Sequence, residues 1–138
     1  MGLKSSLDEI LKNIERAKRN TFTKKDVIIV AATKTRSFNQ INQVYSLGIR
    51  HIGENRIQEA EGKFESFEEM PKITRRFIGH LQSNKINKFI KLFDTIDSID
   101  SYKLANKINT RIEHRKLTGL IEVNTSGDKN KNLSLIHI

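Results

Sequence analysis

The chain has 138 residues, a length that suits one domain with its own hydrophobic core. It contains no cysteine, which excludes disulfides and thiolate metal sites, and no apolar run approaches the roughly 20 residues that span a bilayer. The formal net charge is +9, but the basic residues are dispersed among acidic ones, which favours solvated helix faces over a nucleic-acid surface.

The N-terminal segment predicts an amphipathic helix that Ser5 or Ser6 caps and that ends near Asn20. Residues 27–32 then form a continuous apolar, β-branched run, which predicts a strand buried on both faces, as in a parallel sheet. Helices and strands alternate from there onward. We expect helices at 38–47, 56–67, 84–91 and 101–115, and strands at 49–52, 75–78, 93–96 and 117–123.

Alternating strands and helices indicate parallel β-α-β units, which close either as an open doubly wound sheet or as a (β/α)8 barrel. In both architectures, functional residues gather at the carboxyl ends of the strands. Each predicted strand here is followed by a cluster of polar residues at that end, whereas the residues before the strands are plainer. The sequence therefore predicts a site on one edge of the sheet.

Lys34 follows the first predicted strand directly. A lysine at the end of a buried strand lies at the boundary between core and solvent, where partial desolvation favours the neutral, nucleophilic amine. Such an amine can condense with an aldehyde to form an imine. The alternative is a lysine that ends a strand and extends its ammonium group to water.

Three further residues in strand-end clusters are candidates for the site. Asn55 could donate to a cofactor oxygen or cap the next helix. His80 could act as an acid or base, although the sequence offers no evident Ser or Cys partner. Asn124 could bind phosphate or ring atoms, or belong to a polar turn. The histidines lie far apart and no phosphate-loop or dinucleotide motif is present, so we expect no metal site.

Taken together, four segments resemble, in order and spacing, the YggS/PROSC family of pyridoxal phosphate homeostasis proteins. That family is similar to the N-terminal barrel domain of bacterial alanine racemase. The resemblance runs from about residue 5 to about residue 131. The segments are Ala32-Thr33-Lys34-Thr35-Arg36, Gly53-Glu54-Asn55-Arg56-Ile57-Gln58-Glu59, Phe77-Ile78-Gly79-His80-Leu81-Gln82-Ser83-Asn84-Lys85 and Glu122-Val123-Asn124-Thr125-Ser126-Gly127-Asp128.

The resemblance implies a (β/α)8 barrel with pyridoxal 5′-phosphate (PLP) at its carboxyl mouth. Lys34 matches the lysine that holds PLP as a Schiff base, and Asn55 and Asn124 match residues around the pocket. We expect His80 to join this cofactor-binding set, and we expect no catalytic residue.

The family resemblance also implies a carrier and regulator of intracellular PLP. This agrees with the residues, which lack the paired acid and base that a racemase places on both sides of its substrate. A PLP-dependent racemase-like enzyme and a basic nucleic-acid-binding module are the alternatives. We expect a cytoplasmic protein, monomeric at full length, with PLP as its partner and no nucleic-acid or membrane partner.

A (β/α)8 barrel takes about 250 residues. The predicted elements here amount to an N-terminal helix and about five of the eight βα units. We therefore expect residues 1–132 to be the N-terminal part of a PLP-binding barrel domain. Residues 133–138 depart from the family pattern, and we hypothesise that this tail is foreign sequence that follows a truncated reading frame.

Overall fold

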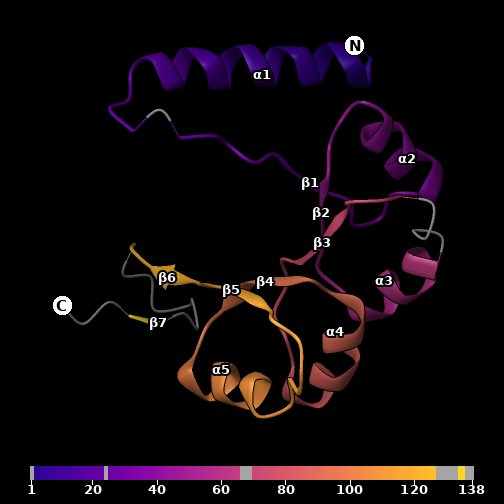
Figure 1. Ribbon diagram of the computed structural model, residues 1–138, viewed down its shortest axis with the longest axis vertical. Helices are drawn as coiled ribbons and strands as arrows, with labels where there is room; N and C mark the ends of the chain where they lie inside the picture. The colour runs from indigo at the N-terminus through magenta and orange to yellow at the C-terminus, as the bar shows by residue number, and fades with distance from the viewer. Residues whose placement is uncertain (1, 24, 66–69, 127–133, 136–138) are drawn as a thin grey trace.

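The computed structural model describes residues 2–23, 25–65, 70–126 and 134–135 (Figure 1). A long N-terminal helix precedes a regular alternation of strands and helices, as the sequence predicts. In chain order the elements are α1 (Leu3–Arg19), β1 (Val30–Ala32), α2 (Phe38–Ser46), β2 (His51–Glu54), α3 (Ile57–Phe64), β3 (Thr74–Phe77), the 3-10 helix η2 (Ser83–Lys85), α4 (Ile86–Leu92), β4 (Thr95–Ile99), α5 (Tyr102–Asn109), β5 (Thr118–Ile121), β6 (Val123–Asn124) and β7 (Ser134–Leu135).

The first five strands form one parallel sheet in the order β1-β2-β3-β4-β5. Strand order follows chain order, whereas a doubly wound sheet reverses its order partway across. Figure 1 shows α2, α3, α4 and α5 on the outer side of the curved sheet. A sequentially ordered parallel sheet with all its crossover helices on one side is the arrangement of a (β/α)8 barrel. The expected partial barrel of five strands is therefore confirmed.

Four phenylalanines form the centre of the core between the sheet and helices α3 and α4. Their ring centroids lie 5.1–5.6 Å apart, and three of the four contacts are edge-to-face. Burying each ring contributes on the order of 1.5–3 kcal/mol, and edge-to-face contact adds to this. This cluster anchors α3 and α4 against the middle of the sheet. Its members are Phe64, Phe77, Phe89 and Phe93.

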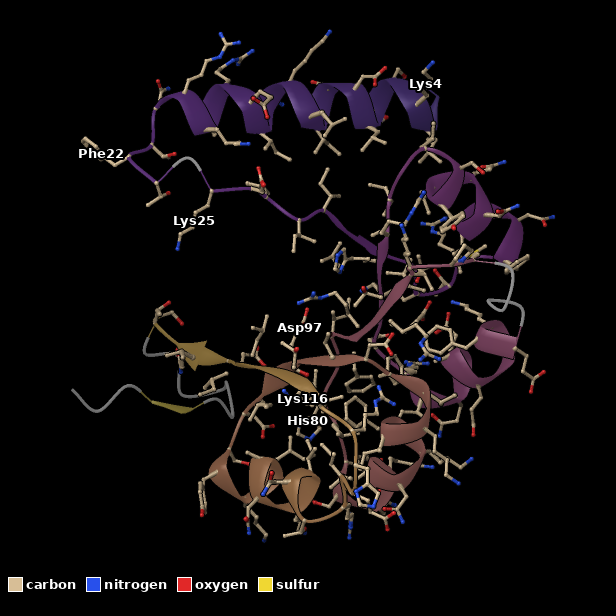
Figure 2. All side chains as sticks on the ribbon, in the orientation of Figure 1. Lys4, Phe22, Lys25, His80, Asp97 and Lys116 are labelled. Carbon is tan, nitrogen blue, oxygen red and sulfur yellow. The ribbon has the colours of Figure 1, made fainter. Side chains whose placement is uncertain are left out.

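The two faces of the sheet differ because successive side chains on a strand point to opposite sides. Arg75 lies 5.8 Å from the Phe64 ring of α3, so it faces the helices. Arg76 therefore faces the other side, where its Nε donates to Asp97 at 2.7 Å. In Figure 2 Asp97 lies on the side of β4 away from α4 and α5. In a closed barrel this polar face would be the interior.

Two predictions about the strands are wrong in detail. The first strand begins at Val30 rather than at residue 27, and the side chains of Val27 and Ile28 are 54% and 60% exposed. Burial fails there because Val27 and Ile28 precede β1, whose pairing with β2 begins only at Val30. The predicted strand 117–123 divides into β5 and β6, and β6 pairs with β7 instead of the main sheet.

Helix boundaries also differ from the predictions. Helix α1 begins at Leu3 with Gly2 as its N-cap, and Ser5, inside the first turn, donates its hydroxyl to the Gly2 carbonyl, so capping by Ser5 or Ser6 is wrong. Helix α5 ends at Asn109 rather than at 115, and Arg115 instead donates to the carbonyls of Ile90 and Phe93. These bonds return the chain to the sheet, which a continued helix would prevent.

Of the predicted tail 133–138, only the backbone of Ser134–Leu135 is described, as β7 parallel to β6. Residues 133 and 136–138 lie outside the described residues. Within the described ranges, no helix combines the length and apolarity needed to cross a membrane.

Candidate functional site

Three of the predicted site residues follow the carboxyl ends of neighbouring strands. Lys34 comes after β1, Asn55 after β2 and His80 after β3. These strands are parallel and adjacent, so the three residues lie along one edge of the sheet. The structure therefore places these three residues at the carboxyl ends of the strands, where the sequence predicted a site.

Lys34 occupies a tight turn. The Arg36 N–H donates to the Thr33 carbonyl at 3.0 Å, which closes a β-turn with Lys34 and Thr35 at its centre. Thr35 has a φ of 61°, in the left-handed region that β-branched residues rarely adopt. The side chain of Lys34 is exposed, so the partial burial expected from the sequence is not present in this structure.

Helix α2 begins immediately after this turn. Ser37 accepts from the Gln40 N–H at 3.4 Å, and Gln40 Oε1 accepts from the Ser37 N–H at 3.0 Å. This reciprocal capping box fixes where the helix starts. The loop between β1 and α2, which contains Lys34, is therefore fixed by the β-turn at its start and by the capping box at its end.

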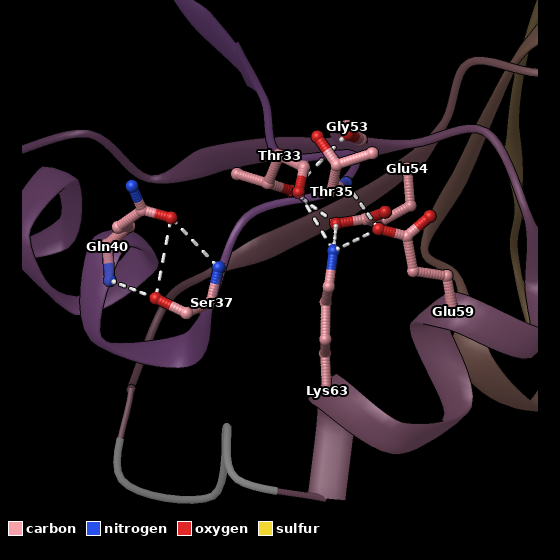
Figure 3. A network of polar contacts seen from close by, with 8 residues as sticks. All are labelled: Thr33, Thr35, Ser37, Gln40, Gly53, Glu54, Glu59 and Lys63. Atoms are coloured by element: carbon pink, nitrogen blue, oxygen red, sulfur yellow. Dashed lines mark hydrogen bonds and ion pairs between the residues drawn. The ribbon is translucent and has the colours of Figure 1, made fainter.

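A network of charged side chains lies directly beneath the Lys34 turn (Figure 3). Lys63 Nζ donates to three oxygens at 2.8 Å each: Glu54 Oε1, Glu59 Oε1 and the Thr33 carbonyl. Glu54 is fully buried and also accepts from Thr33 Oγ1 at 2.6 Å. The Thr35 N–H donates to Glu59 Oε1. A buried carboxylate thus obtains its counter-charge from the same ammonium group that contacts the turn.

The ionisation of this network reflects these contacts. Hydrogen bonds from Lys63 and from the Thr35 backbone hold the pKa of Glu59 below its ordinary value of 4.5. Burial lowers the pKa of Lys63, but hydrogen bonds to Glu54 and Glu59 outweigh it, and the pKa is raised overall. Both shifts favour the charged forms of Glu59 and Lys63 at neutral pH.

The sequence did not predict Glu54, Glu59 and Lys63 as site residues. Two local signals were present: Glu59 and Lys63 have the i, i+4 spacing of a helical ion pair, and Glu54 ends a buried strand. Neither signal indicates that the three side chains meet under Lys34. That meeting depends on how α3 packs against β1 and β2.

Asn55 and His80 share a pocket of about 500 Å³, which Lys34 and Asn124 do not line. Asn55 Oδ1 is buried and has no hydrogen-bond partner among the described residues. Helix α3 takes Arg56 as its N-cap without a side-chain cap bond, so the helix-capping role considered for Asn55 is wrong. Asn55 thus lines the pocket and also holds a buried amide oxygen whose hydrogen-bonding capacity the described residues leave unused.

Gly79 brings two of the strand-end segments together. A Cβ atom there would lie 2.2 Å from the Asn55 carbonyl oxygen, which belongs to the backbone and has little freedom to move. The Gly79 carbonyl accepts from Ser98 Oγ at 2.5 Å. The close packing of the segments after β2 and β3 therefore requires glycine at this position.

His80 contacts a carboxylate at the same end of the sheet. Its Nδ1 lies 3.0 Å from Asp100 Oδ2, and the histidine side chain is 72% exposed. Asp100 follows β4 and also accepts from Ser101 Oγ at 3.0 Å. The carboxylate thus holds the ring through Nδ1. The expectation that His80 lacks a Ser or Cys partner is compatible with this aspartate partner.

Asn124 lies in β6 and its side chain is used locally. Its Oδ1 accepts from the Ser126 N–H at 3.2 Å and from Ser126 Oγ at 3.0 Å. This geometry is that of a polar turn, one of the two interpretations of the segment. Gly127 and Asp128, the last two residues of the family-like segment, lie outside the described residues.

A second polar group lies on the barrel-interior face. Arg76 Nη1 lies 3.4 Å from His51 Nδ1, and Arg76 is also paired with Asp97. Burial, followed by the nearby guanidinium, lowers the pKa of His51 below its ordinary value. The histidine is therefore neutral at physiological pH, and this face carries one ion pair beside a neutral imidazole.

No family model matches the chain. The chain is 38% identical over 107 residues to the pyridoxal phosphate homeostasis protein of Synechocystis sp., covering 76% of this chain and 49% of that protein. It is 34% identical over 135 residues to the protein of the same name from Helicobacter pylori, covering 95% of this chain and 60% of that protein. The chain thus spans about half the length of the curated relatives it matches.

Solved structures show the same similarity. PipY of Synechococcus elongatus, solved without PLP, aligns with a TM-score of 0.70 and 34% identity over 77% of this chain and 50% of that one. The structure of PipY with PLP bound aligns with a TM-score of 0.58 over 69% of this chain and 44% of that one, also at 34% identity.

Proposed function

Because the chain belongs to the family of pyridoxal phosphate homeostasis proteins, we propose that it forms part of a PLP-binding carrier and regulator in which Lys34 holds the cofactor. The observation that carries this proposal is an accessible lysine at the carboxyl edge of a barrel sheet, set in a turn fixed on both sides. We place the protein in the cytoplasm, without a nucleic-acid or membrane partner.

PLP supplies an aldehyde, with which a neutral lysine amine condenses with the loss of one water molecule. The described residues fit the aldehyde end of such a ligand. Lys34 offers an exposed primary amine to the aldehyde, and the side-chain N–H groups of Asn55 can donate to a ligand oxygen. His80 and Asn124 complete the proposed contact set. Asn55, His80 and Asn124 serve to bind and orient the ligand, and Lys34 anchors it.

Borohydride trapping tests the assignment. The protein expressed from its complete reading frame is incubated with PLP, reduced and digested, and the modified peptides are mapped. We expect the pyridoxyl label on Lys34, and its loss in Lys34→Ala. Lys91→Ala is the matched control, because Lys91 is an exposed lysine on α4, outside the proposed site. A label that falls mainly on another lysine would refute the proposal.

The His80–Asp100 pair favours a second candidate, a PLP-dependent racemase-like enzyme. A carboxylate-held imidazole can accept and return a proton, which is one of the two acid–base groups that racemisation needs. Following amino-acid racemisation by the PLP-loaded protein distinguishes the candidates. Turnover that His80→Gln abolishes, with the Lys34 label intact, would favour the enzyme over the carrier.

A further inference from the structure

We infer that Glu59 and Lys63 are positioning residues for Lys34, which hold its turn from beneath and so set the direction of its amine. The inference rests on the proposed function in one respect, namely that Lys34 is the residue that carries PLP. It adds residues from α3 to the site, although neither side chain lines the pocket of Asn55 and His80.

The peptide groups on both sides of Lys34 are held by side chains of α3. The carbonyl of Thr33, before the lysine, accepts from Lys63 Nζ at 2.8 Å. The N–H of Thr35, after the lysine, donates to Glu59 Oε1. Lys63 and Glu59 also contact each other at 2.8 Å, so the two holding groups are linked. The Glu59–Lys63 ion pair therefore binds the backbone of the turn on both sides of Lys34.

This pair cannot easily shift, because Glu54 ties it to the core. An ammonium group has three protons, and those of Lys63 meet three oxygens at 2.8 Å. Glu54 is fully buried, and any movement of Lys63 would leave its carboxylate without a counter-charge. Buried Glu54 thus fixes the position of Lys63, and Lys63 in turn fixes the Thr33 carbonyl of the turn.

The turn needs such a hold, because Thr35 has a φ of 61°. A β-branched residue in the left-handed region is strained, and strained backbone persists only where surrounding contacts over-determine it. The Glu59 carboxylate supplies that contact at the Thr35 N–H. Without it, we expect Thr35 to return to a negative φ, which turns the chain immediately after Lys34 and redirects the lysine side chain.

The experiment compares Glu59→Ala, Glu59→Gln and the control Glu61→Ala in the protein expressed from its complete reading frame. Glu61 belongs to the same helix and is also ion-paired, to Lys88 at 2.9 Å, but it does not touch the turn. Two readouts are measured: hydrogen exchange of the Thr35 amide without PLP, and the rate of borohydride-trapped labelling of Lys34 at limiting PLP.

We expect Glu59→Ala to speed exchange at Thr35 and slow labelling of Lys34 by about tenfold each, the effect of releasing a strained turn. Glu59→Gln should keep most of the protection of the Thr35 amide and most of the labelling rate of Lys34, because its amide oxygen still accepts from the Thr35 N–H. Glu61→Ala should match the unmodified protein. Adding Thr35→Gly to Glu59→Ala should restore much of the labelling rate, since glycine adopts a positive φ without strain.

Equal labelling of Lys34 in Glu59→Ala and Glu61→Ala would overturn the inference, as would failure of Thr35→Gly to restore the rate in a variant with native circular dichroism. If Glu59→Ala does not fold, Glu59→Gln and Thr35→Gly decide the question by the same two readouts. Absence of label on Lys34 in the unmodified protein would refute the proposed function instead. Hydrogen exchange at Thr35 would then still test whether Glu59 holds the turn.

Discussion

Replacing Lys63 with methionine should lower the free energy of unfolding by about 3 kcal/mol, because it removes a cation and leaves a buried carboxylate. Glu54 is 0% exposed and its contact with Lys63 is 2.8 Å. Loss of one partner from a buried pair costs roughly 3–5 kcal/mol. The lower end applies here, since 13% of the Lys63 side chain and 25% of the Glu59 side chain are exposed and water can replace part of the interaction.

Urea unfolding followed by circular dichroism measures this loss, provided that the m-value is unchanged. Lys88→Met is the matched control: it breaks a pair with Glu61 whose side chains are 56% and 40% exposed. A surface pair of this kind contributes about 0–1 kcal/mol. Adding Glu54→Gln to Lys63→Met should recover at least ~1 kcal/mol, because the uncompensated charge disappears. The reasoning would be refuted if Lys63→Met cost no more than Lys88→Met, or if Glu54→Gln deepened the loss.

Three further predictions concern pH, packing and association. The pKa of Glu59 is lowered by Lys63 and the Thr35 backbone, so its contribution to stability is present above 4.5 and is lost as pH falls through the lowered value. Urea unfolding across that range should show a smaller acid-induced loss for Glu59→Gln; an identical profile would contradict this. Gly79→Ala should destabilise by more than about 1 kcal/mol through its clash with backbone. Gly62→Ala, in open space on α3, should stabilise by about 0.5–1 kcal/mol. If thermal melts showed both variants stabilised or both destabilised, the difference in packing around Gly79 and Gly62 would not explain the result. The 138-residue chain by itself should self-associate, because Ile121 on the edge strand β5 is 70% exposed and Ile28, just before the edge strand β1, is 60% exposed; a monodisperse species in sedimentation velocity would contradict this.

Much of the fold follows from local patterns in the sequence. The alternation of strands and helices was predicted for all five main-sheet strands, and the apolar run at 27–32 and the helical spacing of apolar residues carried it where they were present. The strand-end positions of Lys34, Asn55 and His80 followed from the same patterns. The ends of elements were less predictable. Helix α5 stops at Asn109, and Arg115, which the helix was predicted to include, instead donates to carbonyls more than 20 residues earlier, a contact that no local pattern contains.

The sequence by itself determined that Lys34 follows a strand of a parallel α/β sheet and that its neighbouring motifs resemble one family. Only the tertiary structure decided what surrounds that lysine. Glu54, Glu59 and Lys63 converge beneath its turn because α3 packs against the ends of β1 and β2, and because the register pairs Ala32 with Gly53. Hydrophobic periodicity predicts which faces are buried, but it carries no information on which polar side chains meet across them. That depends on strand register and helix packing, which are set by contacts distant in the chain.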